Sequence, residues 1–151
     1  MTGKSIVIHA SAVAVDDHAI LIRGESGSGK SALARQLIQL GAMAGRRTAL
    51  VADDRSALIR EEGRIIVSPV PAGAGLLEVR GVGIVRVPFR TAVMLALVVD
   101  LDSTSTPRLP EPEERAAEIL GLRQPRIVVN GPENALLVLW RLGIGDDAFV
   151  T

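Results

Sequence analysis

The sequence has little or none of several residue types on which common functions depend. It contains no cysteine, which excludes disulfides and thiolate-bound zinc. Its two histidines, His9 and His18, are too few for a histidine-rich metal site. Its aromatic residues are Phe89, Trp140 and Phe149, and so few rings exclude the stacking platforms that bind single-stranded nucleic acid.

Net charge and long apolar runs are also missing. The 17 basic residues balance 17 acidic ones, so we do not expect the basic surface of a nucleic-acid-binding protein. The longest apolar run, residues 92–99, is far shorter than the roughly 20 residues that cross a bilayer. Residues 1–5 have one positive charge and lack the apolar segment of a signal peptide. We therefore expect a cytoplasmic protein without nucleic-acid or membrane partners.

What the sequence does contain is enough apolar material for a core. Of its 151 residues, 48% are hydrophobic, which predicts one domain over residues 1–151. Apolar runs predict strands at residues 6–9, 12–15, 19–22, 48–51, 56–60, 64–68, 92–101 and 126–130. Helical spacing predicts helices at residues 32–43, 113–120 and 132–142. Many consecutive strands lack a helical crossover, so we expect an α/β fold with a mixed, partly antiparallel sheet and flanking helices.

The most informative motif lies between the strand at 19–22 and the helix at 32–43. It fits the phosphate-binding pattern G-x-x-x-x-G-K-[ST], in which glycines let backbone N–H groups curl around a polyphosphate. Its residues are Gly24, Glu25, Ser26, Gly27, Ser28, Gly29, Lys30 and Ser31. Lys30 would reach the outer phosphates and Ser31 would bind magnesium. The alternative is an ordinary glycine-rich turn, but the flanking strand and helix favour a phosphate-binding loop.

Two acidic segments accompany this loop. Asp53 and Asp54 directly follow the buried strand at 48–51, and the carboxyl ends of sheet strands face the ligand crevice in open α/β folds. Glu78 and Arg80 precede glycines at which the backbone can approach a ligand closely. The alternatives are that the aspartates only end a strand and that Glu78 and Arg80 form a solvated strand face.

Four segments together resemble the catalytic domain of HPr kinase/phosphorylase, the bifunctional serine kinase of the bacterial sugar phosphotransferase system. They are His9, the loop at 24–31, residues 50–54 and residues 77–84, in this order. His9 alone would more often be a structural histidine. The Glu-x-Arg-Gly-x-Gly-Ile segment within 77–84 is the more specific part, because phosphate loops occur in many families. The N-terminal domain of longer members is absent, which implies a stand-alone catalytic domain.

The resemblance implies the fold shared with phosphoenolpyruvate carboxykinases, with ATP in the loop. Ser31 and Glu78 match the family's magnesium ligands, and Asp53 would lie near the metal. The family forms hexamers, which implies a homo-oligomer. The implied protein partner is an HPr-like phosphocarrier, phosphorylated on a serine.

The resemblance also implies roles in the reaction. Asp54 matches the general base that takes the proton from the substrate serine, and His9 matches the residue that supports this aspartate. Lys30 would meet charge in the transition state. The family's catalytic arginine is matched most nearly by Arg108, with Arg115 as an alternative.

Departures from the family pattern leave three functions open. Ala32 stands where the family has an acidic residue, which predicts weaker metal binding and slow kinase turnover. Residues 129–134 lack the arginine tied to dephosphorylation, which puts phosphorylase activity in doubt. Residues 42–47 lengthen a turn away from the site. The alternatives to a protein-serine kinase are an ATP-sensing module without phosphate transfer and a small-molecule kinase built on the same loop.

Overall fold

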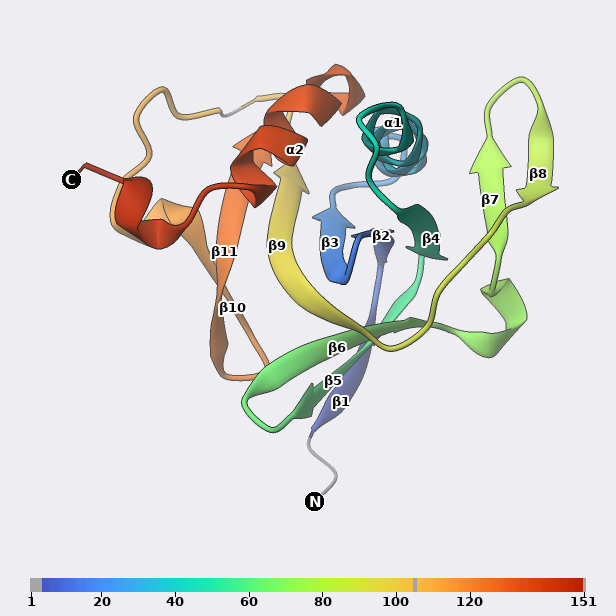
Figure 1. Ribbon diagram of the computed structural model, residues 1–151, viewed down its shortest axis with the longest axis horizontal. Helices are drawn as coiled ribbons and strands as arrows, with labels where there is room; N and C mark the ends of the chain where they lie inside the picture. Colours follow the sequence, from blue (N-terminus) through green and yellow to red (C-terminus); the bar gives the residue numbers. More distant parts are fainter. Residues whose placement is uncertain (1–3, 105, 151) are drawn as a thin grey trace.

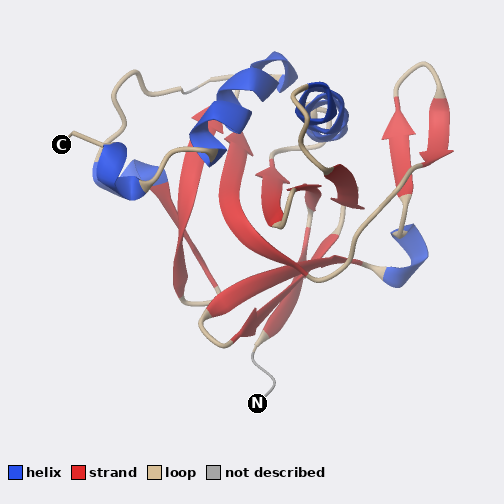
Figure 2. Cartoon of the chain, viewed as in Figure 1, coloured by secondary structure: helices blue, strands red, loops and turns tan. Residues whose placement is uncertain are grey.

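A mixed nine-stranded sheet with two α-helices on one side dominates the computed structural model, which describes residues 4–104 and 106–150 (Figures 1 and 2). Its strands are β1 (Ser5–Ile8), β2 (Ala10–Val15), β3 (His18–Arg23), β4 (Thr48–Ala52), β5 (Ser56–Glu61), β6 (Arg64–Pro69), β9 (Val93–Leu101), β10 (Ala116–Ile119) and β11 (Leu122–Val129). The helices are α1 (Lys30–Met43) and α2 (Ala135–Leu142). β7 (Leu76–Val79) and β8 (Gly83–Arg86) form a separate hairpin beside α1 (Figure 1).

The strand order explains how the phosphate loop is placed. The main path through the sheet runs β1-β5-β6-β9-β3-β2-β4. β3 and β11 both pair with β9 in parallel, whereas the remaining pairs of this sheet are antiparallel. The three parallel strands therefore end at the same edge, from which the chain leaves β3 into the loop and α1 (Figure 1). The predicted mixed sheet is confirmed.

Side chains of the central strands point alternately to the two faces of the sheet and form an apolar cluster on each face. One face holds Val13, Val15, Ile20 and Ile22 beneath the helices. The other face holds small side chains from β2 together with residues of β5, β6 and β10. Because side chains alternate with period two, β2, β3, β4 and β9 supply residues to both clusters. The small side chains let the curled sheet pack closely against itself.

The first helix forms where helical spacing predicts it. Leu33, Ala34 and Leu37 are fully buried against the sheet, and burial of this stripe stabilises the helix far more than intrinsic propensity does. The helix ends at Met43, and Gly45 follows with a φ of 81°, the left-handed conformation that glycine adopts at low cost. Among the described residues, no helix has the length and apolar character needed to cross a bilayer.

The predicted helix at 113–120 is wrong. This segment forms a short 3-10 helix, η2 (Pro112–Arg115), followed by strand β10. Leu120 and Gly121 have φ values of 52° and 80°, which suit a two-residue hairpin turn into β11. The alanines and glutamates of the segment have good helix propensity, but pairing with β11 and burial of Ala117 and Ile119 favour the strand.

Other boundaries differ less. The last strand, predicted at 126–130, is longer and spans β11. The loop before β7 contains a 3-10 turn, η1 (Pro71–Gly73), and the closing helix begins with another, η3 (Pro132–Asn134). A further 3-10 turn, η4 (Asp146–Ala148), follows α2.

The ends of the parallel strands are joined by one acidic side chain. Asp100 of β9 accepts two hydrogen bonds from Arg23 of β3, each at 2.8 Å, and another from Arg126 of β11. The carboxylate is only 17% exposed. Its burial alone would raise the pKa of Asp100, but the hydrogen bonds from Arg23 and Arg126 outweigh that effect and hold the pKa below its ordinary value.

We expect Asp100→Asn to lower the free energy of unfolding by about 2–3 kcal/mol at neutral pH, because two mostly buried guanidinium groups lose their anion. A depressed carboxyl pKa contributes stability above its unfolded-state value and loses that contribution as pH falls through the folded-state value. The difference between wild type and variant should therefore shrink below about pH 4. Urea unfolding at several pH values measures it. Asp147→Asn, an exposed change, is the control, and equal effects of the two changes would contradict the role of Asp100.

Candidate active site

The phosphate loop is held in shape by its own backbone and by η3. Gly29 precedes α1 with a φ of 105°, and a Cβ atom there would lie 3.0 Å from Cδ of Pro132. Only glycine suits both the conformation and the space. The Lys30 side chain is 6% exposed, and its ammonium group donates to the carbonyl oxygens of Gly24 at 2.9 Å and Glu25 at 3.1 Å.

The loop fits the polyphosphate of a nucleotide by several observations. α1 begins at Lys30 with no side-chain cap and no acidic residue in its first turn. The first N–H groups of a helix lack intrahelical partners, so they are available to an anion. The Ser28 hydroxyl is buried within the loop without a hydrogen-bond partner. Together with the Lys30 charge, these donors suit phosphate oxygens.

Asp53 accepts hydrogen bonds from three separate segments. Its Oδ1 accepts from the hydroxyls of Ser31 at 2.7 Å and Ser11 at 3.0 Å. Its Oδ2 accepts from the backbone N–H of Glu78 at 3.0 Å. The carboxylate therefore joins the start of α1 to β2 and to the β7–β8 hairpin.

Asp54 faces the other way. Its φ of 69° is left-handed, a conformation that aspartate tolerates better than most residues. Its backbone N–H donates to the Ser11 hydroxyl at 3.1 Å, and its Oδ1 lies 3.1 Å from Nε2 of His9. The side chains of His9 and Asp54 are 51% and 61% exposed. The left-handed turn thus sends one aspartate inward, to the loop, and the next outward, to solvent.

A pocket of about 540 Å³ lies between the loop and the hairpin. This volume is ordinary for a small-ligand site. Its lining comprises Ser26, Gly27, Ser28, Gly29, Lys30, Ser31, Ala32, Arg35, Asp54, Glu78, Val79, Arg80 and Pro132.

The donor set suits a hard cation that keeps other ligands. Within the described chain, no three histidine, aspartate or glutamate side chains gather as metal ligands. Ser31 and Glu78 line the pocket and offer a hydroxyl and a carboxylate, and Asp53 accepts hydrogen bonds from the Ser31 hydroxyl and the Glu78 N–H. Magnesium is commonly bound by one or two carboxylates plus substrate phosphates and waters, so these residues fit it.

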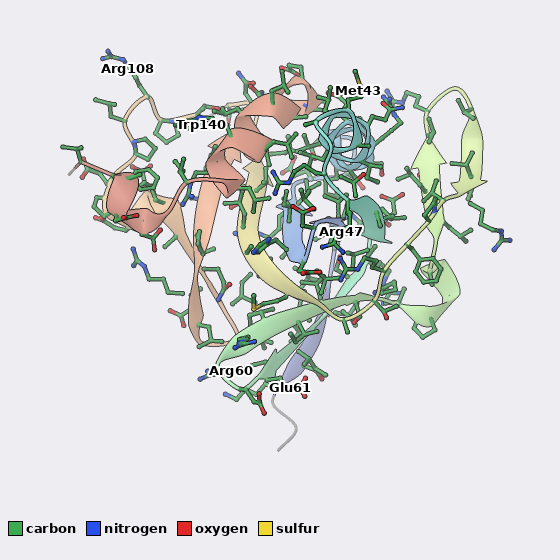
Figure 3. The ribbon with its side chains drawn as sticks, in the orientation of Figure 1. Met43, Arg47, Arg60, Glu61, Arg108 and Trp140 are labelled. Carbon is green, nitrogen blue, oxygen red and sulfur yellow. The ribbon has the colours of Figure 1, made fainter. Side chains whose placement is uncertain are left out.

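The sequence-predicted residues divide into two groups. His9, Lys30, Ser31, Asp53, Asp54 and Glu78 come together around the loop. The two sequence-predicted arginines, Arg108 and Arg115, lie elsewhere. Arg108 is exposed on the outer side of the segment between β9 and η2, away from α1, and is not among the described residues that line the pocket (Figure 3). Arg115 lines a different pocket, near the C-terminus.

Sequence reasoning missed Ser11 and Arg35 and left Arg80 as a possible solvated residue. Ser11 is fully buried and bonds both aspartates, and its only signal was a serine in an apolar strand two positions after His9. Arg35 lies four residues after Ser31 on α1, a spacing that places both on one helix face. Arg35 and Arg80 line the pocket with Lys30, so three basic side chains accompany the carboxylates of Asp54 and Glu78 there.

Comparison with known proteins agrees with this geometry. Residues 2–129 match the model of the family described as "HPr Serine kinase C-terminal domain". The HPr kinase/phosphorylase of Clostridium tetani (strain Massachusetts / E88) is 44% identical over 81 residues, covering 54% of this chain and 25% of that protein. The HPr kinase/phosphorylase of Streptococcus thermophilus (strain CNRZ 1066) is 38% identical over 81 residues, covering 53% of this chain and 24% of that protein. The matched stretch thus spans about a quarter of these relatives' length.

A solved structure extends the match to most of the chain. The "Structure of the Hpr(Ser) kinase/phosphatase from Coxiella burnetii" is 28% identical, with a TM-score of 0.69, and the match covers 88% of this chain and 91% of that one. The expected fold class, an α/β domain of this kinase type with a mixed sheet and flanking helices, is confirmed. The chain belongs to the HPr serine kinase C-terminal domain family.

Proposed function

We propose that this chain is an ATP-dependent protein-serine kinase that phosphorylates an HPr-like phosphocarrier. The observation that carries the proposal is the Asp54 carboxylate, 3.1 Å from His9 at the edge of the pocket that the phosphate loop lines. The names of the relatives, HPr kinase/phosphorylase, support the choice of substrate. In this proposal residues 1–151 act as one catalytic domain in the cytoplasm.

The loop binds the phosphates of ATP through backbone N–H groups and Lys30. Ser31 and Glu78 hold magnesium, with Asp53 orienting Ser31 through the 2.7 Å hydrogen bond. When bound, the metal neutralises charge that develops on the transferred phosphoryl group. Arg35 and Arg80 are the other cations that line the pocket. We assign to them the role of the catalytic arginine, which the sequence had matched to Arg108 or Arg115.

Asp54 is the general base. Its carboxylate accepts the proton of the substrate serine, whose oxygen then bonds to the γ-phosphorus while the bond to the leaving ADP breaks. His9 orients the carboxylate. Because both side chains are about half exposed or more, a serine on another protein can reach Asp54. A small-molecule kinase would instead need a closed pocket around its substrate, so the protein substrate is favoured.

Self-association is part of the proposal. Leu136, Leu137 and Trp140 of α2 are 67%, 46% and 65% exposed, and large apolar side chains gathered on one exposed helix suit an interface between copies of the chain. Figure 3 shows Trp140 on the outer side of α2.

We expect Asp54→Asn to reduce phosphate transfer from ATP to purified HPr at least about 100-fold, since an amide cannot accept the serine proton. Mass spectrometry of the carrier after incubation with ATP and magnesium, and then with phosphate alone, measures both directions of the reaction. Asp17→Asn is the control, because Asp17 is also exposed but lies outside the pocket. Equal phosphate transfer by the wild-type protein and Asp54→Asn would refute the role of Asp54 as general base.

The same experiment, with calorimetric titration of ATP into the wild-type protein, tests the alternative of an ATP-sensing module. Ala32 lines the pocket beside Ser31 without offering a metal ligand, which is the observation that favours this alternative. ATP binding with no phosphorylated carrier from the wild-type protein would support the sensing module and refute the kinase.

Ser11 positions both aspartates, so we expect Ser11→Ala to lower kcat about tenfold with little change in the KM for the carrier. The variant leaves the Asp54 N–H without its acceptor and Asp53 without one donor. Ser56→Ala is a matched control, because Ser56 is equally buried and its hydroxyl donates to the backbone oxygen of Ala10. If both variants lose the same stability and the same kcat, the role of Ser11 is only structural.

Restoring an acidic residue after Ser31 should strengthen metal binding. We expect Ala32→Glu to lower the magnesium concentration that gives half-maximal transfer several-fold, since a further hard oxygen ligand is added to the pocket. Ala42→Glu, on an exposed position at the other end of α1, should not change it. Magnesium titrations of the initial rate provide the measurement, and identical curves for the two variants would show that position 32 does not approach the metal.

A further inference from the structure

The β7–β8 hairpin supplies side chains to the pocket, and residues 87–92 join it to β9. We refer to these residues as the connector. The connector passes along β4, the last strand on the main path of the sheet (Figure 1). The N–H of Leu50 on β4 donates to the Pro88 oxygen at 3.2 Å, and the Arg90 N–H donates to the Leu50 oxygen at 2.8 Å. The hairpin is therefore attached to the sheet at a second place, away from the phosphate loop.

The connector also closes the base of the hairpin. The Val87 N–H donates to the Gly75 oxygen at 2.9 Å. Gly75 has a φ of 75°, and a Cβ atom there would lie 2.8 Å from Cδ1 of Phe89, so the Phe89 ring packs against the backbone just before β7. Because both ends of the hairpin are bound to the connector, a shift of the connector along β4 would move the whole hairpin.

The Arg90 side chain binds the connector to the turn between β2 and β3. Its guanidinium donates to the backbone oxygen of Asp16 and, at 3.4 Å, to a carboxylate oxygen of Asp17. The side chains of Arg90 and Asp17 are 40% and 73% exposed, so solvent weakens their ion pair. The Asp16 oxygen is therefore the main partner of Arg90.

Asp16 is itself held by the turn between α1 and β4. Its N–H donates to the Arg47 oxygen at 2.7 Å, and its carboxylate accepts from the Arg47 N–H at 3.0 Å and from Nε of Arg46 at 2.6 Å. The hydrogen bonds from Arg46 and from the Arg47 N–H hold the pKa of Asp16 below its ordinary value, so the carboxylate stays charged at neutral pH. These contacts fix the position of the backbone oxygen that Arg90 binds.

The two attachments of the hairpin lie at opposite ends of β4. The strand begins at Thr48, next to Arg47, and ends at Ala52, next to Asp53. At the second end Asp53 accepts the hydrogen bond from the Glu78 N–H at 3.0 Å. A strand of five residues spans about 16 Å. Two attachments so far apart resist a rotation of the hairpin that either one alone would allow.

We propose that Arg90 is a positioning residue for the magnesium and nucleotide site, because it holds the connector against β4 and so keeps Glu78 and Arg80 in place at the pocket. The proposal rests on the proposed function, which assigns Glu78 to magnesium and Arg80 to the charge of the phosphates. Arg90 is not among the described residues that line the pocket. It acts through the hairpin, so its loss removes no group that touches the nucleotide.

Arg90→Gln tests the proposal, with Arg47→Gln as the matched control. The Arg47 side chain pairs with the same two aspartates, at 4.0 Å from Asp16 and 3.7 Å from Asp17. It belongs to the turn between α1 and β4 and not to the connector. The two variants therefore remove the same charge from the same cluster, but only Arg90→Gln releases the connector.

Hydrogen exchange of the protein without ligand, resolved by residue with NMR, is the first measurement. The N–H groups of Leu50, Glu78 and Val87 form the hydrogen bonds that hold the connector and the hairpin. We expect these three amides to exchange at least about fivefold faster in Arg90→Gln than in the wild-type protein, since local opening becomes easier. Amides at the centre of β3 should keep their rates, and Arg47→Gln should match the wild type throughout.

Calorimetric titration with ATP, in magnesium and in EDTA, is the second measurement. The phosphate loop and Lys30 act in both conditions, whereas Glu78 contributes through the metal. We expect Arg90→Gln to raise the dissociation constant of ATP about fivefold in magnesium and at most about twofold in EDTA. A general loss of stability would weaken both affinities equally. Arg47→Gln should bind ATP as the wild type does.

Unchanged exchange of the three amides in Arg90→Gln, equal changes in Arg47→Gln, or faster exchange throughout the sheet would overturn the proposal. Faster exchange of the three amides with an unchanged affinity for ATP in magnesium would also overturn it, as would equal losses of affinity in magnesium and in EDTA. Failure of the proposed function has a different signature, because the wild-type protein would then transfer no phosphate to the carrier while the exchange rates still report whether Arg90 holds the hairpin.

Discussion

The half-buried carboxylate of Asp53 connects the segments that form the site. It accepts hydrogen bonds from Ser31 at the start of α1, from Ser11 on β2 and from the backbone of Glu78 on β7. Those three segments come from distant parts of the chain, and the β7–β8 hairpin is not paired with the main sheet. Together with the packing of Leu77 into the core, this side chain places the hairpin opposite the phosphate loop and so shapes the pocket between them.

A second carboxylate supports the sheet edge from which the loop starts. Asp100 lies directly opposite Arg23 in the parallel pairing of β3 with β9, and Arg126 reaches it from β11. Three parallel strands are thus tied at their carboxyl ends, just before the chain enters the loop at Gly24. Loops carry function when a rigid scaffold positions them, and these charge-assisted contacts make the scaffold rigid at that edge.

Residues close in sequence were predicted well, and residues brought together over long distances were not. The loop and α1 followed from a local motif and helical spacing, and they are confirmed. The helix expected at 113–120 failed because a partner strand decided its structure, and local propensity did not reveal that partner. Arg108 and Arg115 were matched by order along the chain, yet neither lines the pocket beside the phosphate loop, whereas Arg35 and Arg80 do. Ser11 was missed because its importance lies in its contacts with residues 53 and 54.

By itself the sequence determined that the chain has a phosphate loop between a strand and a helix, with two aspartates after the next strand, because these features depend on short-range spacing and backbone freedom. It also predicted the mixed sheet, since short connections between consecutive strands favour antiparallel pairing. The tertiary structure alone decided that Asp53 turns inward and Asp54 outward toward His9, because a left-handed turn and the hydroxyl of Ser11 separate two adjacent carboxylates. It alone gathered Arg115, Arg123 and Arg141 into one pocket, because that requires η2, β11 and α2 to pack against each other.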